Sequence, residues 1–231
     1  MMLQQTQINR VTEKFQQFVQ AFPNFKTLAT APLNDVLKIW QGLGYNRRAV
    51  ALKSIAEKVT DEFNGILPAD VEILKSFPQI GHNTASSIVA FAFNIPTFFI
   101  EVNIRRVYIY FFFPGKSSIP DSVIMPIVRK TIDSSNVRKW YYALMDYGVM
   151  LKKSHPELLK RSTHYRKQSK FKGSNREIRG KILKLLIESK ELTESELIKK
   201  LKIDSEKLKR ILEQLFKEGF IKWEDKKISI L

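Results

Sequence analysis

The sequence contains no cysteine. Without thiols the chain can form no disulfide, no thiolate nucleophile and no thiolate metal site. Histidine is also scarce, because His82, His155 and His164 are the only three. They do not stand at the spacing of metal ligands. We therefore expect no metal site built from side chains, and we assign the histidines no catalytic role.

Long apolar runs are also missing. No run reaches the roughly 18 to 20 residues that would span a bilayer. The first ten residues, MMLQQTQINR, lack the charged head and apolar stretch of a secretory signal. We expect a cytoplasmic protein without a membrane partner.

Acidic residues are few for a chain of 231 residues. Asp and Glu number 23 against 39 Lys and Arg, so the net charge is +16 and the pI is about 9.9. A charge of this sign suits a protein that binds a polyanion, and nucleic acid is the first candidate. The alternative is a basic surface that serves solubility alone. With 44% hydrophobic and 27% charged residues, the composition predicts a folded globular protein.

The first two thirds of the chain follow a helical pattern. Apolar residues recur at helical spacing from Leu3 to about Phe113, and a further helix is expected over residues 140–152. Glycine and proline at 42, 44, 65, 68, 114 and 115 predict short helices joined by tight turns. The predicted fold class is all-α, with a first domain over residues 1–151. The aromatic cluster of Tyr108, Tyr110, Phe111, Phe112 and Phe113 is expected in its core.

The remainder changes character twice. Residues 152–173 lose periodicity and carry eight Lys or Arg against one Glu, which predicts a basic linker. From residue 174, capping signals at Ser174, Thr193 and Asp204 predict three helices, the last ending at Gly219. Two short β-prone runs, FIKW and KISIL, follow. This order is typical of a small winged helix-turn-helix, predicted over residues 174–231.

The most informative segment is LKSFPQIGHNTASSIVAFAF, residues 74–93. A short helix is expected to end at Phe77, and a second to begin near His82 after a tight turn. Such a turn directs backbone N–H groups and a helix N-terminus outward, where a phosphate can bind. Gly81 allows the close approach of another backbone.

FPQIGHNTA resembles the hairpin of the helix-hairpin-helix DNA glycosylases, the superfamily of endonuclease III and adenine DNA glycosylase, with its LPGVGxxTA pattern. Four other segments resemble adenine glycosylase segments in the same order: MLQQTQ, GLGYNRRA, IEVNIRRV and ALMDYG, which begin at residues 2, 42, 100 and 143. Five ordered matches over about 150 residues make the resemblance specific. It implies an enzyme that flips a nucleotide out of the duplex and hydrolyses the bond between base and sugar.

The resemblance implies a catalytic carboxylate at Glu101, with Asn103 beside it. A carboxylate close to the anomeric carbon stabilises the positive charge that develops on the sugar. The alternative is that Glu101 only caps a helix that begins near Val102. The family has Asp at this position, so the carboxylate of Glu101 is about one methylene further out, a displacement that can cost about 10²-fold in rate.

Two further departures concern chemistry. The family's general acid is a Glu in the pattern SEVMLQQT, and the matching position would fall immediately before Met1. The iron-sulfur cluster that the family commonly binds is excluded because its four cysteines are absent. A monovalent cation held by backbone carbonyls of the hairpin is the one cofactor that the resemblance allows.

The position of the family's Schiff-base lysine is occupied by Asn83, so we expect a monofunctional enzyme that uses water. The hairpin residues Gln79, Gly81, His82, Asn83 and Thr84 are predicted to bind DNA. The family inserts side chains into the DNA stack at the positions of Gln5 and Tyr45. A surface or structural role is the alternative for Gln5, Tyr45 and Asn83.

Basic residues complete the predicted DNA interface. Arg47 and Arg48 follow Tyr45. Arg105 and Arg106 are expected to contact a phosphate or to form internal salt bridges. In the winged module, Lys207 and Arg210 lie on the expected recognition helix. The prediction is thus a monomeric DNA repair glycosylase acting on duplex DNA with a lesion or mismatch, with adenine as the candidate base. A catalytically impaired DNA-structure-binding protein and a winged-helix transcription regulator are the alternatives.

Overall fold

A computed structural model describes residues 1–167 and 170–231. The chain forms two compact units. Unit 1 combines residues 1–67 with the described residues from 170 onward, and unit 2 covers residues 68–167. No helix in these described ranges is long and apolar enough to cross a membrane.

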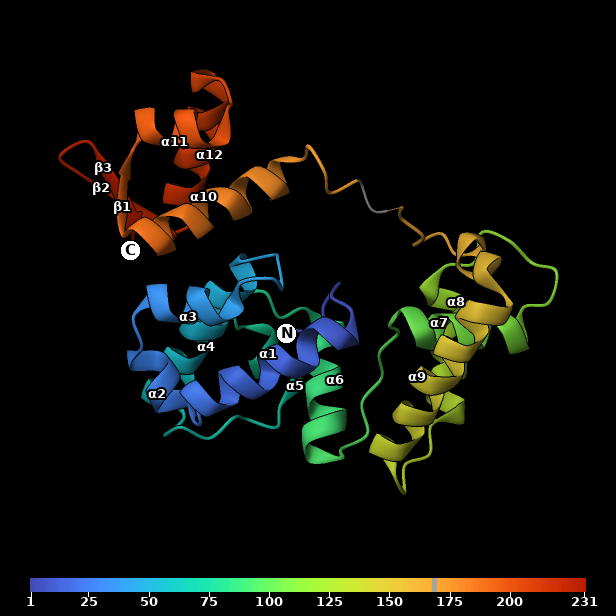
Figure 1. The fold of residues 1–231 in the computed structure, drawn as a ribbon. Helices are drawn as coiled ribbons and strands as arrows, with labels where there is room; N and C mark the ends of the chain where they lie inside the picture. Colours follow the sequence, from blue (N-terminus) through green and yellow to red (C-terminus); the bar gives the residue numbers. More distant parts are fainter. Residues whose placement is uncertain (168–169) are drawn as a thin grey trace. The chain divides into compact units, whose positions relative to one another are not determined.

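The N-terminal part of unit 1 consists of short helices, as predicted. They are α1 (Ile8–Ala21), α2 (Phe25–Thr30), α3 (Leu33–Trp40) and α4 (Arg47–Glu62) (Figure 1). Asn24 and Thr27 form a capping box at the start of α2, which the sequence analysis did not find. The fully buried Trp40 packs edge-on against Phe18, so α1 and α3 share one core.

The C-terminal part of unit 1 is a small helical module with one sheet. It contains α10 (Asn175–Ser189), β1 (Glu191–Thr193), α11 (Glu194–Leu201), α12 (Ser205–Lys217), β2 (Ile221–Glu224) and β3 (Lys227–Ile230). The strands pair antiparallel in the order β1-β3-β2. Figure 1 shows α10 leading into this sheet, with α11 and α12 beside it.

The predicted caps and hairpin of this module are confirmed. Thr193 and Glu196 form a reciprocal capping box, and Asp204 accepts a hydrogen bond from the backbone N–H of Lys207. Ser174 caps α10, but Glu177 reaches back to the N–H of Gly173 instead of the N-cap residue. The strand β1 was not predicted. It is three residues long, too short to show alternation in sequence.

The two parts of unit 1 share one hydrophobic core. Helix α10 packs against α3, and Ile182 and Leu186 of α10 belong to the same buried cluster as Val36 and Trp40. Burial of apolar side chains on both sides of this contact holds the module against the N-terminal helices.

Unit 2 contains the predicted hairpin and the helices that follow it. Its elements are α5 (Val71–Lys75), α6 (His82–Phe93), α7 (Val102–Phe112), α8 (Asp121–Thr131), α9 (Val137–Ser154) and the 3₁₀ helix η1 (Pro156–Arg161). Helix α7 packs against α9 and η1. Phe99, Ile104, Tyr108 and Tyr141 lie in its buried core.

Two expectations are corrected here. Residues 152–161 of the predicted linker form the end of α9 and all of η1. The N–H of Ile119 donates to the backbone oxygen of Arg161, beside a short bridge to Ser162. Residues 168 and 169 of that linker lie outside the described residues. In the aromatic cluster only Tyr108 and Phe113 are buried. Tyr110, Phe111 and Phe112 are exposed.

Candidate active site and DNA interface

Glu101 is the N-cap residue of α7. Its Oε1 accepts hydrogen bonds from the backbone N–H of Asn103 at 2.7 Å and of Ile104 at 3.1 Å. Glu101 therefore caps the helix, as the alternative interpretation of the sequence expected. The same bonds fix the direction of its carboxylate. Capping does not oppose a catalytic role, because both bonds end on Oε1 and the helix N-terminus favours a negative charge.

The surroundings of Glu101 disfavour its charged form. Burial is the largest cause and raises the pKa of this carboxyl, whereas the amide bonds and the charge of Arg106 oppose that rise. A partly desolvated carboxylate interacts more strongly with a developing cation than a hydrated one would. The raised pKa makes Glu101 a candidate functional residue independently of any motif.

Asn103 and Arg106 are held together one helical turn beyond Glu101. The buried Arg106 donates to Oδ1 of Asn103 at 2.6 Å and to the backbone oxygen of Gly148 at 2.7 Å. Asn103 was predicted as a site residue. Arg106 was expected to contact a phosphate or to form an internal salt bridge, and Gly148 was given no role. A glycine inside the helical pattern of residues 140–152 was the available signal, because such a glycine often marks a close approach.

The hairpin turn lies between α5 and α6. The N–H of Ile80 bonds to the oxygen of Phe77 at 3.2 Å, and Gln79 has φ +60°. Pro78 in second position and a positive φ in third are features of a type II turn. This third position, a glycine in the family pattern, is thus occupied by a strained Gln79.

Gly81 is the N-cap residue of α6 and has no side chain with which to cap the helix. A Cβ on Gly81 would meet nothing within 4 Å, so the protein itself leaves space at this position. The first amides of α6, at His82, Asn83 and Thr84, face this end of the helix. Open space beside the N-terminus of a helix is what an approaching phosphate needs.

Side chains of α6 connect the hairpin to the Glu101 segment. His82 Nε2 lies 3.0 Å from the oxygen of Phe98, so it carries the proton in that contact. Asn83 Nδ2 donates to the oxygen of Ile100 at 3.0 Å. Both side chains are engaged within unit 2, and any role of His82 and Asn83 in DNA binding rests on their backbone N–H groups. These two bonds tie the start of α6 to the segment that directly precedes Glu101.

Arg105 forms an internal salt bridge, one of the two predicted roles. Its Nε and Nη2 each lie 2.7 Å from an oxygen of Asp121 in a bidentate pair. This pair ties α7 to the start of α8, and it occupies the guanidinium that was predicted to bind DNA.

Arg48 is corrected to a structural residue. Its side chain is buried, with 4% exposure, and it donates to backbone oxygens of the segments 1–4 and 43–45 and to the hydroxyl of Thr6. A guanidinium has enough donors to satisfy two loops at once. Arg48 therefore joins the two loops that carry Gln5 and Tyr45.

Gln5 and Tyr45 lie on these joined loops. Both have positive φ, +57° and +48°, in a backbone region that residues other than glycine rarely adopt. Strain of this kind is common at functional sites. Gln5 is exposed and Tyr45 is 36% exposed, so the structure brings the two predicted stack-inserting residues to neighbouring surface segments. Arg47 is half-exposed and pairs with Glu218 of the C-terminal module.

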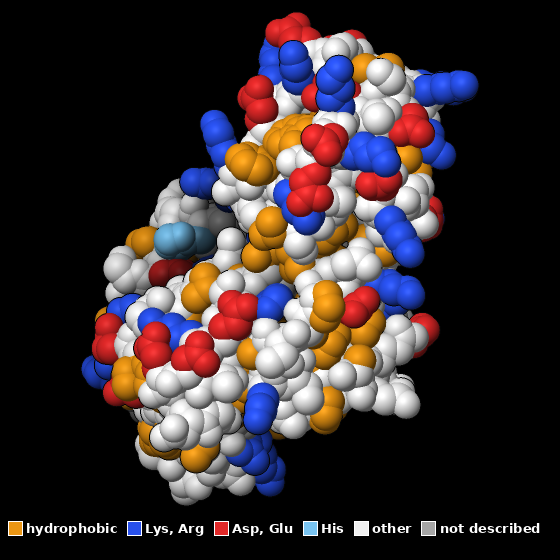
Figure 2. Space-filling model, turned by 90° about the vertical axis from the view of Figure 1, so that its left-hand side faces the viewer, with side chains coloured by type: hydrophobic (Ala, Val, Ile, Leu, Met, Phe, Trp, Pro, Cys, Tyr) orange, Lys and Arg blue, Asp and Glu red, His pale blue; other side chains and the backbone are white. Residues whose placement is uncertain are grey.

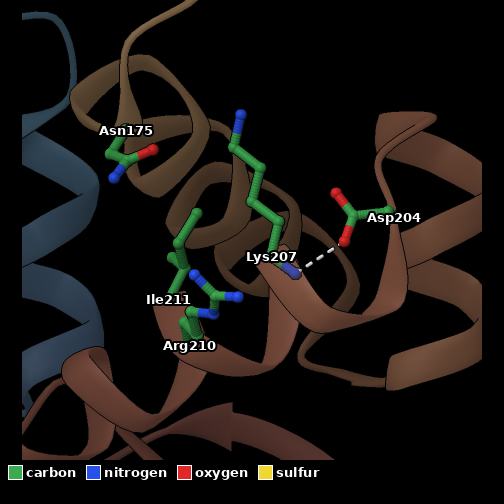
Figure 3. Close-up of a pocket in the computed structure, with 5 residues that line it drawn as sticks. All are labelled: Asn175, Asp204, Lys207, Arg210 and Ile211. Atoms are coloured by element: carbon green, nitrogen blue, oxygen red, sulfur yellow. Dashed lines mark hydrogen bonds between the residues drawn. The ribbon is translucent and has the colours of Figure 1, made fainter.

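Lys207 and Arg210 line a hollow of about 320 Å³ together with Asn175, Asp204 and Ile211 (Figure 3). Arg210 also pairs with Glu206 one turn earlier on α12. On the face drawn in Figure 2, acidic side chains stand among the basic ones. Together with Asp204 in the same hollow, Lys207 and Arg210 form a small site of mixed charge.

The fold is that of a DNA glycosylase. Over 67% of the chain it matches an endonuclease III–DNA complex, with a TM-score of 0.54, 18% identity and 70% coverage of that structure. A thermostable thymine-DNA glycosylase matches over 71% of the chain and 80% of its own, with a TM-score of 0.58 and 20% identity.

The sequence comparisons give the family. The HhH-GPD superfamily base excision DNA repair proteins match residues 1–125, and the chain belongs to this superfamily. Residues 169–228 match the TFIIE alpha subunit family. An adenine DNA glycosylase of Buchnera aphidicola subsp. Baizongia pistaciae is 35% identical over 161 residues, covering 68% of the chain and 45% of that protein. The mouse adenine DNA glycosylase is 37% identical over 107 residues, 46% of the chain and 21% of its own length. The chain thus spans less than half the length of these relatives.

Proposed function

We propose that the protein is a DNA N-glycosylase of base-excision repair that removes a damaged or mismatched base, with adenine as the candidate base. The observation that carries the proposal is the placement of Glu101. Its carboxylate has a raised pKa and a direction fixed by two amides, and it is connected through Ile100 to the hairpin. The similarity to adenine DNA glycosylases supports the choice of base.

In this proposal Glu101 acts by electrostatics. As the bond between base and sugar lengthens, positive charge develops on the sugar, and the ionised carboxylate stabilises it. The base leaves as this bond breaks, water adds to the sugar carbon, and the proton that the water loses balances the proton that the departing base takes up. Asn83 offers no amine for a Schiff base, so the enzyme is monofunctional and leaves an intact strand with an abasic site.

Binding is divided between two kinds of contact. The N-terminus of α6 and the turn at Gln79 and Gly81 hold a backbone phosphate. The cofactor in this proposal is a monovalent cation bound by backbone carbonyls of the same hairpin. Gln5 and Tyr45 fill the space left by the flipped nucleotide. The protein acts as a monomer on duplex DNA.

The C-terminal module is proposed to be a winged helix with an accessory role in DNA binding. Three helices, a hairpin of β2 and β3, and the match to the TFIIE alpha family support this assignment. In it α12 is the recognition helix, with Lys207 and Arg210 near its start. The same observations favour a second candidate function, in which the module makes the chain a DNA-binding regulator.

The test is release of a base. Duplexes with adenine opposite 8-oxoguanine, adenine opposite guanine, thymine opposite guanine and uracil are incubated with the protein and then treated with alkali, which cleaves abasic sites. We expect cleavage of one strand only after alkali, and loss of cleavage by about 10² or more in Glu101→Gln. Glu72→Gln is the matched control, because Glu72 is a well-exposed acid of the same unit.

Binding without release from every duplex would reject the enzyme and leave a DNA-binding protein. Strand cleavage without alkali, or covalent trapping by borohydride, would reject the monofunctional mechanism. Unchanged release by Glu101→Gln would show that another residue stabilises the sugar cation.

A further inference from the structure

Two arginines, Arg47 and Arg179, meet at the contact between the two parts of unit 1, and a third, Arg176, lies nearby on α10. Arg176 and Arg179 lie one turn apart on α10, and Arg47 begins α4. Arg47 and Arg179 both pair with the carboxylate of Glu218, at the end of α12. Arg179 engages both of its oxygens, with one Nη1–Oε1 distance of 3.2 Å. Two guanidinium groups thus pair with one carboxylate, which leaves an excess of positive charge.

Arg176 connects this cluster to Tyr45. Its Nη1 donates to the hydroxyl of Tyr45 at 2.7 Å, and its guanidinium carbon lies 5.6 Å from the centre of the ring. Arg48 lies 5.4 Å from the same ring. The arginine cluster therefore adjoins the residue that the proposed function places in the DNA stack.

The geometry of the cluster fits a phosphate as well as a carboxylate. Arginine binds both groups through paired N–H donors, and both carry negative charge. Glu218 is held at 15% side-chain exposure and Arg179 at 16%, but Arg47 remains 53% exposed. An incoming anion can therefore reach Arg47 first without unfolding the module, which the apolar contact between α10 and α3 holds in place.

We propose that Arg47, Arg176 and Arg179 form a binding site for a phosphate of the DNA backbone, that Glu218 occupies this site in the free protein, and that the phosphate displaces Glu218 on binding. The inference rests on the proposed function in taking DNA as the ligand. It makes the C-terminal module part of the same DNA interface as Tyr45, on a surface other than its recognition helix.

The test is affinity of the full chain for an undamaged duplex, measured by fluorescence anisotropy over a series of salt concentrations. Glu218→Gln removes the competing charge, and we expect binding about tenfold tighter at low salt. The matched control is Glu224→Gln, which changes the net charge equally at an exposed position in the sheet of the module. It should shift affinity by no more than about twofold. Equal or weaker binding by Glu218→Gln than by this control overturns the proposal.

Removal of an arginine supplies an independent arm if Glu218→Gln does not fold. Arg47→Ala should weaken binding about fivefold and lower the salt dependence by roughly one counterion. Arg10→Ala, on the exposed part of α1, is its control. When Glu218→Gln is combined with Arg47→Ala, the gain in DNA affinity from Glu218→Gln should shrink, because the two residues share one site. If Arg47→Ala matches Arg10→Ala, the proposal is wrong.

These measurements are separate from base release. Tighter binding by Glu218→Gln together with no release from any duplex rejects the glycosylase and retains the phosphate site. Release of a base together with unchanged binding by Glu218→Gln rejects the phosphate site and retains the glycosylase.

Discussion

Gly148 of α9 lies against Asn103 of α7. A Cβ built on Gly148 would stand 2.6 Å from both the Cβ and the backbone oxygen of Asn103. Because the obstructing atoms include backbone, no rotation of a side chain can relieve the clash. The absence of one methyl group at residue 148 thus allows α9 to approach the first turn of α7, the turn that Glu101 caps.

Gly148→Ala should therefore destabilise the protein, by about 1 to 3 kcal/mol, because the two helices must separate. Separation would also break the hydrogen bond from Arg106 to the Gly148 oxygen. Gly180→Ala is the matched control. Gly180 lies inside α10 with nothing within 4 Å of an added Cβ, so the same change should raise stability by about 0.5 to 1 kcal/mol. Denaturant unfolding of both variants measures the change in unfolding free energy. Changes of the same sign in the two variants would contradict the expectation.

The raised pKa of Glu101 predicts a pH-dependent stability difference. An acid whose pKa is higher in the folded protein destabilises the fold when ionised. This cost is absent below its ordinary value of 4.5 and is complete above the raised value. Glu101→Gln should then melt higher than the wild type at pH 8, and the gain should shrink as the pH falls toward 4.5. Glu72→Gln should show no such gain. A melting difference for Glu101→Gln that stays constant from pH 8 to pH 4 would contradict the expectation.

The left-handed backbone at Gln79 predicts a stabilising substitution. A side chain at φ +60° costs about 1 to 2 kcal/mol relative to glycine, part of which the greater freedom of unfolded glycine offsets. Gln79→Gly should gain about 0.5 to 1 kcal/mol. Gln7→Gly is the control. Gln7 has φ −69°, so no strain is relieved there, and glycine only increases the conformational entropy of the unfolded chain. Thermal unfolding compares them, and a loss of stability in Gln79→Gly would show that the Gln79 side chain makes contacts that outweigh the strain.

Local features of the fold could be predicted from sequence because they depend on few neighbouring residues. The caps at Thr193 and Asp204 and the hairpin after Gly219 followed from residue types at fixed spacings. The position of Glu101 at the start of α7 followed in the same way. Such features need no knowledge of which helices pack together.

Features that depend on packing could not be predicted so directly. The run from Tyr108 to Phe113 was expected in the core, but consecutive residues of a helix point in all directions around its axis. Helix α7 buries Tyr108 and leaves Tyr110, Phe111 and Phe112 exposed. The contact between Gly148 and Asn103 depends on the packing of α9 on α7, which composition and periodicity do not specify.

Arg47 and Arg48 show the same limit at one dipeptide, because adjacent side chains on a helix diverge. Arg47 faces solvent and Glu218, whereas Arg48 is buried among backbone oxygens.

Arg48→Lys separates a structural role from DNA binding, since it keeps the charge but replaces the guanidinium fork with three donors on one atom. Several carbonyls then lose their partners, and we expect a loss of at least about 2 kcal/mol of unfolding free energy. Arg10→Lys, on an exposed face, should change stability by less than about 0.5 kcal/mol. A variant of Arg48 as stable as the wild type but weaker in DNA binding would return Arg48 to the DNA interface.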